Sequence, residues 1–222
     1  MSHDIFAAIS AGDKNEVTQL IAADPQVGHV RNQTGVSALM QARYENKLEM
    51  VALLRKPVGD LDVFEAAAFG DLPRLQTLLK TDRELAKARS GDGFTPLHLA
   101  CFFGEIEAAQ TLIRQGADAN AGSPARIAVI HSAAASRNAA VVKLVLQGGA
   151  NPNAQQQGGY TALHEAAMHN SVERAQALLD AGADLAIRSD AGLTAAQIAE
   201  QEGSKEVAAL LSSSQKPTAS SR

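Results

Sequence analysis

The sequence predicts an all-α fold, an α-solenoid of stacked helix-turn-helix units with short projecting hairpin loops. Three observations predict it. A histidine recurs at a constant interval of 33 residues, at His98, His131 and His164. Residues whose side chains cap a helix N-terminus recur with the same period, and so do glycines that can close a helix. A fixed period of this length is typical of repeat architectures, in which each unit stacks on its neighbours.

Each unit begins at a residue that we expect to cap its first helix. The starts lie near residues 4, 37, 62, 95, 128, 161 and 194, and all of them except Ala128 are Asp, Ser or Thr. The side-chain oxygens of Asp, Ser and Thr accept the first free backbone N–H groups of a helix. The step from residue 37 to residue 62 is short, at 25 residues, whereas the other steps are 33.

A second amphipathic helix is expected in each unit. In the fourth unit the segment EIEAAQTLIRQ places four apolar residues on one helix face: Ile106, Ala109, Leu112 and Ile113. Gly116 follows, and glycines return at Gly149 and Gly182, where each can adopt the left-handed conformation that closes a helix. A turn rich in glycine comes next, so the unit reads helix, turn, helix and extended loop.

This pattern resembles the ankyrin repeat. The segments TPLHLA at 95–100 and YTALHEAA at 160–167 carry the resemblance, together with the GADAN, GANPN and GADLA segments that follow the second helices. The resemblance covers roughly residues 4–211 and implies a single ankyrin repeat domain over 1–214, with seven repeats and atypical terminal capping repeats. The last residues, 215–222, have almost nothing to bury and are expected to form a disordered tail.

The recurring histidine is interpreted as a structural brace. Thr95 caps the helix, Pro96 suits its first position, and His98 occupies the third position, where a capping box places Glu or Gln. Other units carry Glu65 or Gln197 at this position, which favours a hydrogen-bonding role. The resemblance implies that this histidine bonds the threonine and the backbone of the neighbouring repeat.

No catalytic, cofactor-binding or metal-binding residues are expected, and the chain is predicted not to be an enzyme. In HEAAMH, His169 follows His164 by five residues rather than four, which places it about 140° away around a helix instead of at the spacing of a zinc site. Cys101 is expected to be a small core residue, since its surroundings show no cationic group that would activate a thiol.

Composition narrows the class of partner. The net charge of −4 argues against nucleic-acid binding, which usually needs a basic surface. No apolar run approaches the roughly 18–20 residues of a membrane span, and the segment MSHDIFAAISAGDKNE lacks the features of a secretory signal. A single cysteine fits a reducing compartment. We therefore expect a cytoplasmic monomer that binds neither nucleic acid nor membrane.

The predicted function is macromolecular recognition by a non-catalytic adaptor, scaffold or inhibitor that binds a partner protein through its concave face and loop tips. The resemblance indicates as contact positions the loop tips and the residues that close the first helices: Asp92, Phe94, Phe102, Phe103, Gln157, Tyr160, Met168, His169, Asp190 and Gln201. One residue of the Phe102–Phe103 pair could instead pack against a neighbouring repeat. The alternative is a regulatory subunit, or a repeat protein with a small-molecule or enzymatic site in its groove.

Two departures from the pattern lead to further expectations. Ala128 replaces a capping residue and Arg126 replaces a loop glycine, so the loop at 121–128 is expected to be distorted. The short step between the second and third units leaves no room for a projecting loop, so a gap in the binding groove is expected there.

Overall fold

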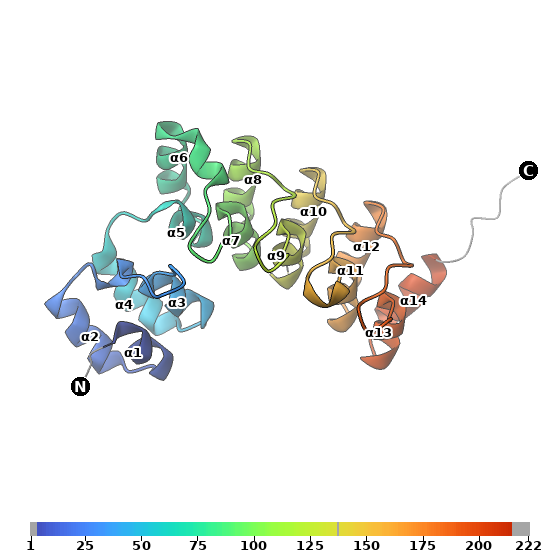
Figure 1. Cartoon of the computed structure of the whole chain (residues 1–222), viewed down its shortest axis with the longest axis horizontal. Coiled ribbons are helices and arrows are strands. Elements are labelled where there is room, and N and C mark those ends of the chain that lie inside the picture. Colours follow the sequence, from blue (N-terminus) through green and yellow to red (C-terminus); the bar gives the residue numbers. More distant parts are fainter. Residues whose placement is uncertain (1–3, 137, 215–222) are drawn as a thin grey trace, which may run out of the picture.

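The computed structural model of the chain describes residues 4–136 and 138–214, which form a row of paired helices (Figure 1). Within these residues there are fourteen α-helices and no strands, which confirms the all-α prediction. The first helices of the pairs are α1 (Ile5–Ala11), α3 (Ala38–Tyr44), α5 (Val63–Ala68), α7 (Pro96–Phe103), α9 (Val129–Ala135), α11 (Ala162–Met168) and α13 (Ala195–Gln201). The second helices are α2 (Lys14–Ala23), α4 (Leu48–Val58), α6 (Leu72–Thr81), α8 (Ile106–Arg114), α10 (Ala139–Gln147), α12 (Val172–Asp180) and α14 (Lys205–Ser214).

Three short 3₁₀ helices lie in the connections between pairs: η1 (Val27–His29), η2 (Arg83–Lys87) and η3 (Gln157–Gly159). The first helices and the connecting loops together form one side of the row, which we call the inner face. Along the row from α5 to α14, Figure 1 shows the second helices on the opposite side. The expected disordered tail at 215–222 lies outside the described residues.

The first helices begin and end for local reasons. The Asp62 carboxylate accepts hydrogen bonds from the backbone N–H groups of Phe64 and Glu65, both at 2.8 Å, and so satisfies two free donors at the start of α5. Gly104 closes α7 with a φ of 77°, a left-handed conformation that costs glycine little. These helices have only six to eight residues, too few to be stable alone in water, so packing must hold them.

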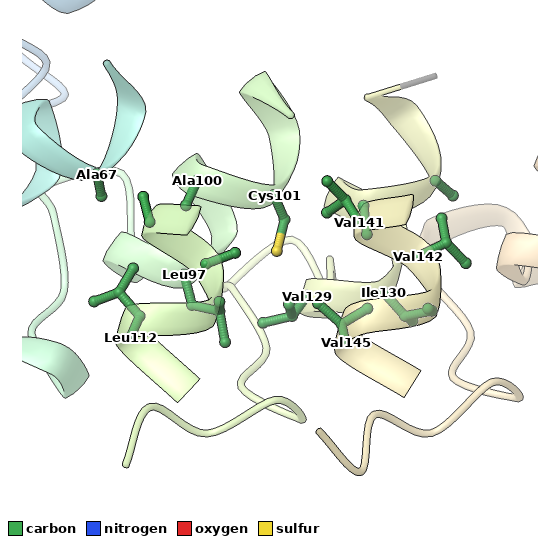
Figure 2. Packing of buried hydrophobic residues seen from close by; sticks show 14 of the residues in the cluster. Ala67, Leu97, Ala100, Cys101, Leu112, Val129, Ile130, Val141, Val142 and Val145 are labelled. Atoms are coloured by element: carbon green, nitrogen blue, oxygen red, sulfur yellow. The ribbon is translucent and has the colours of Figure 1, made fainter. Parts of the chain in front are cut away.

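That packing is a continuous apolar core running along the row. Leu97 and Leu112 of one pair and Val129 and Val145 of the next have no exposed surface. Figure 2 shows Val129 and Val145 on the side that faces the preceding pair, and Leu112 in the same position one unit earlier. Cys101 lies among them, also without exposed surface, and burial raises the pKa of its thiol. Cys101 is therefore a small core residue, as its position in the repeat indicated.

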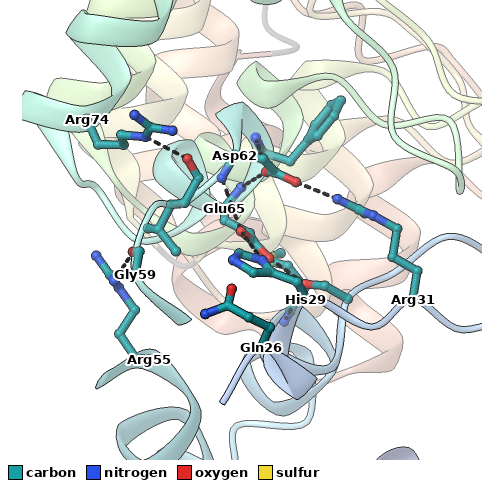
Figure 3. A network of polar contacts seen from close by, with 12 residues as sticks. Gln26, His29, Arg31, Arg55, Gly59, Asp62, Glu65 and Arg74 are labelled. Atoms are coloured by element: carbon teal, nitrogen blue, oxygen red, sulfur yellow. Dashed lines mark hydrogen bonds and ion pairs between the residues drawn. The ribbon is translucent and has the colours of Figure 1, made fainter. Parts of the chain in front are cut away.

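The row changes at the junction between α4 and α5. Elsewhere each first helix packs against the next, as α1 does on α3 and α7 on α9, but α3 and α5 make no comparable contact. The connection runs only from Gly59 to Asp62, so no projecting loop forms here. An apolar cluster of Met40, Ala68 and Leu99 spans the junction. Polar side chains also connect the two parts, and Figure 3 shows this polar network.

The junction network is built on arginines and one buried carboxylate. Arg31 and Arg55 lie before the connection and bind carboxylates that follow it: Arg31 binds Asp62, and Arg55 binds Asp71 at 2.8 Å. Arg74, on α6, donates to the carbonyl oxygen of Leu61 in the connection at 2.7 Å. Glu65, which is only 1% exposed, accepts a hydrogen bond from the Ser37 hydroxyl at 2.7 Å. Its other oxygen lies 3.5 Å from the Nδ1 atom of His29.

The expected gap in the groove is absent, because the loops on either side of the junction meet. A Cβ atom built on Gly91 would lie 2.5 Å from the Thr34 carbonyl oxygen and 2.7 Å from the Cα atom of Gly35. Only glycine permits so close an approach of two backbones. Since the third pair is preceded by no projecting loop, the loop before α3 extends to the loop before α7.

The expected distortion of the loop at 121–128 is also wrong. Gly122 and Ala128 form a backbone bridge like those formed at two other loops, Arg31–Ser37 and Arg188–Thr194. Arg126 takes a φ of 60° and donates its N–H to the Ser123 carbonyl at 2.9 Å. Gly93 makes the equivalent bond in the preceding loop, so the arginine adopts the left-handed conformation of the glycine it replaces.

Candidate interaction surface

The recurring histidines join each unit to the next through the backbone. In α7, Nδ1 of His98 accepts the Thr95 N–H at 3.2 Å and lies 2.8 Å from the Thr95 hydroxyl. Its Nε2 atom lies 3.1 Å from the carbonyl oxygen of Ile127, in the loop that leads into the following unit. Because Nδ1 accepts a hydrogen bond, the proton is on Nε2, and the neutral imidazole donates to Ile127.

The same arrangement occurs in the two following units. Nε2 of His131 faces the Ala154 carbonyl at 3.0 Å, and Nε2 of His164 faces the Leu193 carbonyl at 3.1 Å. Burial lowers the pKa of all three histidines, that of His98 to about 4, so they stay neutral near pH 7. Their role as structural braces is thereby confirmed.

A hollow of about 270 Å³ opens on the inner face. We call it the aromatic hollow. Four helices and the loops between them line it, with these residues: Tyr44, Phe94, His98, Leu99, Phe102, Ile127, His131, Ser132, Ala135, Gln156 and Glu165. The lining surface is almost entirely apolar, although polar residues contribute to it through their apolar atoms: His98, His131, Ser132, Gln156 and Glu165.

Three aromatic rings form one wall of the aromatic hollow. The ring centroids of Tyr44 and Phe102 lie 6.1 Å apart in an edge-to-face arrangement, and the Phe94 ring packs edge-to-face on the His98 imidazole at 5.4 Å. Phe102 keeps 41% of its surface exposed. A large exposed aromatic side chain beside an apolar hollow is typical of a binding surface.

The Phe102–Phe103 pair divides into two environments. Phe103 is half-buried and packs against Tyr44, with ring centroids 5.5 Å apart. The Arg43 guanidinium lies 4.4 Å from the centre of the Phe103 ring and 4.5 Å from that of Phe69. Phe103 therefore belongs to the packing between pairs, and Phe102 is the member that faces the aromatic hollow.

Glu165 lies opposite the aromatic wall, on α11. Its Oε1 atom accepts a hydrogen bond from the Gln156 side chain at 2.8 Å. Burial raises the pKa of Glu165 to about 7, although the hydrogen bond from Gln156 and the charge of Arg174 lower it. Arg174 is 3% exposed and donates to the Ala134 carbonyl. Glu165, one of the residues that line the hollow, therefore changes charge near neutral pH.

A second hollow continues the surface towards the C-terminal end. Ala135, Gln156 and Glu165 line both hollows, and the second one adds three predicted contact residues: Tyr160, Met168 and His169. The Tyr160 ring packs edge-to-face on His164 at 5.8 Å. The aromatic hollow and this second hollow therefore form one continuous groove on the inner face.

The other predicted contact residues lie at the edge of this groove or away from it. Asp92 is half-buried and bonded to the Ser90 hydroxyl, whereas Gln157, Asp190 and Gln201 are exposed. The Asp190 N–H donates to the Gly158 carbonyl at 2.8 Å, which joins two successive loops. None of these four lines either hollow.

Of the residues that line the aromatic hollow, only Phe94 and Phe102 are among the predicted contact residues, and Tyr44, Gln156 and Glu165 are among those that the prediction missed. For Glu165 a signal was present, since neighbouring units carry Leu99, Ser132 or Ile198 at the same place and a carboxylate there is unusual. For Tyr44 none was available, because it reaches α7 only through the short junction between α4 and α5.

Among the residues that the structure describes, no group of three or more His, Cys, Asp and Glu side chains is placed to hold a metal ion. Over the same residues, none of the helices combines the length and the apolar character needed to cross a bilayer.

Comparison with known families agrees with this geometry. Three overlapping stretches, residues 5–123, 63–155 and 130–221, match the family described as ankyrin repeats (3 copies), and together they cover almost the whole chain. The chain belongs to the ankyrin repeat family. It is also similar to an ankyrin repeat protein of Rickettsia felis, with 26% identity over 128 residues. That similarity covers 53% of this chain and 42% of the relative, so the chain spans less than half of the relative's length.

Proposed function

We propose that this ankyrin repeat protein is a non-catalytic interaction module, an adaptor, scaffold or inhibitor that binds a partner protein through its inner face and loop tips. The observation that carries the proposal is the continuous groove made by the aromatic hollow and the second hollow. It presents Phe102, Tyr160 and Met168 together over successive units. Aromatic residues and methionine are enriched at protein interfaces, and a few clustered residues carry most of the binding energy there.

We further propose that residues 1–214 act as one recognition domain of seven repeats, as a monomer in the cytoplasm. Two observations support this. The core is continuous from α1 to α14, and the single cysteine is a buried thiol, which suits a reducing compartment.

The alternative, a small-molecule or regulatory site in the groove, has one observation in its favour, the raised pKa of Glu165 beside an apolar hollow. The volume of the aromatic hollow argues against this alternative. At about 270 Å³ the aromatic hollow is smaller than the roughly 300–1,000 Å³ of most small-molecule pockets. A hollow of this size suits one side chain of a protein partner better than a whole ligand.

The experiment that tests the proposal compares two triple variants of the full chain in affinity capture with mass spectrometry. The first variant replaces Phe102, Tyr160 and Met168 by alanine. The control replaces three exposed apolar residues of the second helices by alanine: Leu48, Ile106 and Val172. We expect a partner protein to be enriched by the native chain and by the control, and lost with the first variant. Enrichment that survives in the first variant and disappears in the control would overturn the proposal.

A further inference from the structure

The aromatic hollow takes its lining from both sides of the junction between α4 and α5. We call α1–α4 the first stack and α5–α14 the second stack. Among the described lining residues, Tyr44 alone comes from the first stack, and the others lie on α7, α9, α11 or the loops before these helices. The Tyr44 ring contacts the Phe102 and Phe103 rings of the second stack, with centroids 6.1 and 5.5 Å apart. The hollow therefore has its full aromatic wall only while the two stacks are together.

The helices of the two stacks are joined loosely. Among the described helices, none of the first stack packs against one of the second as closely as neighbouring helices pack within each stack. The connection begins at Gly59, whose φ of 72° and ψ of −119° are accessible to glycine and strained for other residues. A Cβ atom built on Gly59 would meet no atom within 4 Å beyond its chain neighbours, so the backbone has room to rotate there. Gly59 is thus suited to be a pivot.

The ion pairs across the junction favour the closed arrangement, but water reaches them. The side chains of the Arg31–Asp62 and Arg55–Asp71 pairs keep 27–45% of their surface exposed. Exposed ion pairs contribute little to stability and are screened by salt. The apolar cluster that spans the junction adds to them without such screening. The closed arrangement should therefore weaken, but not disappear, when salt is added.

A buried carboxylate acts against the closed arrangement. Glu65 belongs to the second stack and is 1% exposed, and its Oε1 atom accepts a hydrogen bond from the Ser37 hydroxyl of the first stack at 2.7 Å. His29, 3.5 Å from its other oxygen, is also in the first stack. Removing a carboxylate from water is costly even when it is hydrogen-bonded, and opening the junction would return it to water. The free energy gained at the apolar cluster on closing is therefore partly offset at Glu65.

Two loop backbones meet where the junction is closed. A Cβ atom on Gly91, in the second stack, would lie 2.5 Å from the Thr34 carbonyl oxygen and 2.7 Å from the Cα atom of Gly35, both in the first stack. The φ of Gly91 is not in the left-handed region, so alanine is compatible with the backbone of its own loop. The methyl group of an alanine at this position would therefore meet its obstacle in the opposite stack and act as a wedge.

We propose that the junction is a hinge with its pivot at Gly59 and that Tyr44 is a lid, which the closing hinge brings onto Phe102 and Phe103 to complete the aromatic hollow. The hinge acts on the binding site of the proposed function, on which this inference therefore rests. A partner held in the complete hollow binds the closed form more tightly and shifts the chain towards it. By the same linkage, a change that opens the hinge weakens the binding of the partner.

The test uses the two tyrosines of the chain, Tyr44 and Tyr160, as reporters. Labelling the full chain with 3-fluorotyrosine gives one fluorine NMR signal for each of them, and the variants Tyr44→Phe and Tyr160→Phe assign the signals. Tyr44 reports on the lid. Tyr160 packs on His164 within the second stack and is the internal control.

Gly91→Ala is the wedge variant and Gly122→Ala its matched control. Gly122 also has no left-handed φ, and a Cβ atom there would meet nothing within 4 Å. We expect Gly91→Ala to move the Tyr44 signal towards its position in the urea-unfolded chain and to leave the Tyr160 signal in place. Gly122→Ala should move neither signal.

A salt series on the native chain tests the hinge without any substitution. Raising the ionic strength from about 0.05 M to about 0.5 M screens the exposed ion pairs and should raise the open fraction about threefold. The position of the Tyr44 signal measures this fraction, and the Tyr160 signal should again stay in place.

Two results would overturn the inference. A Tyr44 signal that keeps its native position both in Gly91→Ala and at high salt would show that the junction is rigid. Signals of Tyr44 and Tyr160 that move together would show that the two stacks lose their structure as one unit, without a hinge.

Affinity capture separates the hinge from the proposed function. Gly91→Ala should recover less partner than Gly122→Ala, in proportion to its loss of the closed form. Full recovery by a Gly91→Ala chain whose Tyr44 signal is in the open position would show that the lid is not part of the binding site. The proposed function fails separately, if the inner-face triple variant still captures its partner, and that result leaves the hinge and its NMR test unaffected.

Discussion

The imidazole of His98 lies at the boundary of two units, and both of its nitrogens are bonded to backbone groups. Carboxylate or amide side chains can satisfy the local half of this role, as Glu65 does with the Asp62 N–H at 3.2 Å. The second nitrogen lets histidine also reach the next unit. His164 and Glu165 are adjacent in sequence, yet the first braces the stack and the second faces the groove, because successive residues of a helix point in different directions.

The His98→Gln variant should show how the brace depends on pH. The pKa of His98 is about 4 in the folded chain and about 6.5 when unfolded, so the unfolded chain binds more protons between these values. The brace is therefore fully present above pH 6.5 and is lost as the pH falls towards 4. We expect the variant to be less stable than the native chain by about 1–2 kcal/mol at pH 7.5.

That stability difference should shrink or reverse near pH 4.5, because glutamine does not titrate. Urea unfolding of both proteins across pH 4.5–7.5 measures it. Glu165, whose raised pKa acts in the opposite direction between about 4.5 and 7, is common to both and cancels in the comparison. A constant difference across the series would show that His98 does not change its protonation state on unfolding.

At the scale of the element, each inter-unit loop keeps its shape even where its sequence departs from the pattern. The loop before α9 retains its bridge and its turn although alanine replaces the capping threonine and arginine replaces the glycine. One bond of the cap survives, since the Ala128 N–H still donates to Nδ1 of His131 at 3.1 Å. The loss is limited to the side-chain oxygen of the capping residue.

Restoring that oxygen should stabilise the protein. The Ala128→Thr variant supplies a hydroxyl at the N-terminus of α9, where the backbone is already extended with a φ of −82° and a ψ of 162°. We expect a gain of about 1 kcal/mol in the free energy of unfolding. Thr95→Ala, the reverse change at the equivalent place before α7, should lose a similar amount.

Thermal and urea unfolding of the two variants provide the measurement. Destabilisation by Ala128→Thr would mean that the half-buried methyl group of Ala128 fills a space that cannot take the larger side chain.

At the scale of the whole molecule, the junction between α4 and α5 joins two regular stacks of helix pairs, α1–α4 and α5–α14. Besides the polar network between the second and third pairs, some contacts across it skip one unit. The second pair reaches the fourth through the Gly35–Gly91 approach and through the rings of Tyr44, Phe102 and Phe103. Arg43 holds this contact, because it lies between two rings and binds Glu105. The same contact places Tyr44 in the aromatic hollow.

Removing the Arg43 side chain should loosen the junction more than it destabilises either stack. For Arg43→Ala we expect faster cleavage between α4 and α5 by a protease that cuts before aspartate, since Asp60 and Asp62 lie in that connection. The lost cation–π and ion-pair contacts are worth about 2 kcal/mol in a half-buried setting, which corresponds to a roughly thirtyfold increase in the open population.

Limited proteolysis followed by mass spectrometry measures the rate of this cleavage. The exposed Arg114→Ala on α8 serves as the control and should cleave at the native rate. An unchanged rate in Arg43→Ala would show that the arginine network at Arg31, Arg55 and Arg74 is sufficient to hold the junction.

The repeating pattern of the sequence determined the helices, their caps and the role of the histidines. These features depend on local interactions, such as that of Thr95 with His98, which recur wherever the residues recur. Phe94, Tyr160 and Met168 could be placed on the groove for the same reason. Arg126 takes the left-handed conformation that its own loop requires. The closing of the gap and the entry of Tyr44 into the aromatic hollow were decided by tertiary packing. Both features depend on contacts between the second and fourth pairs, which are not neighbours in sequence. The short connection at 59–62 brings these two pairs together, and no local sequence pattern records such contacts.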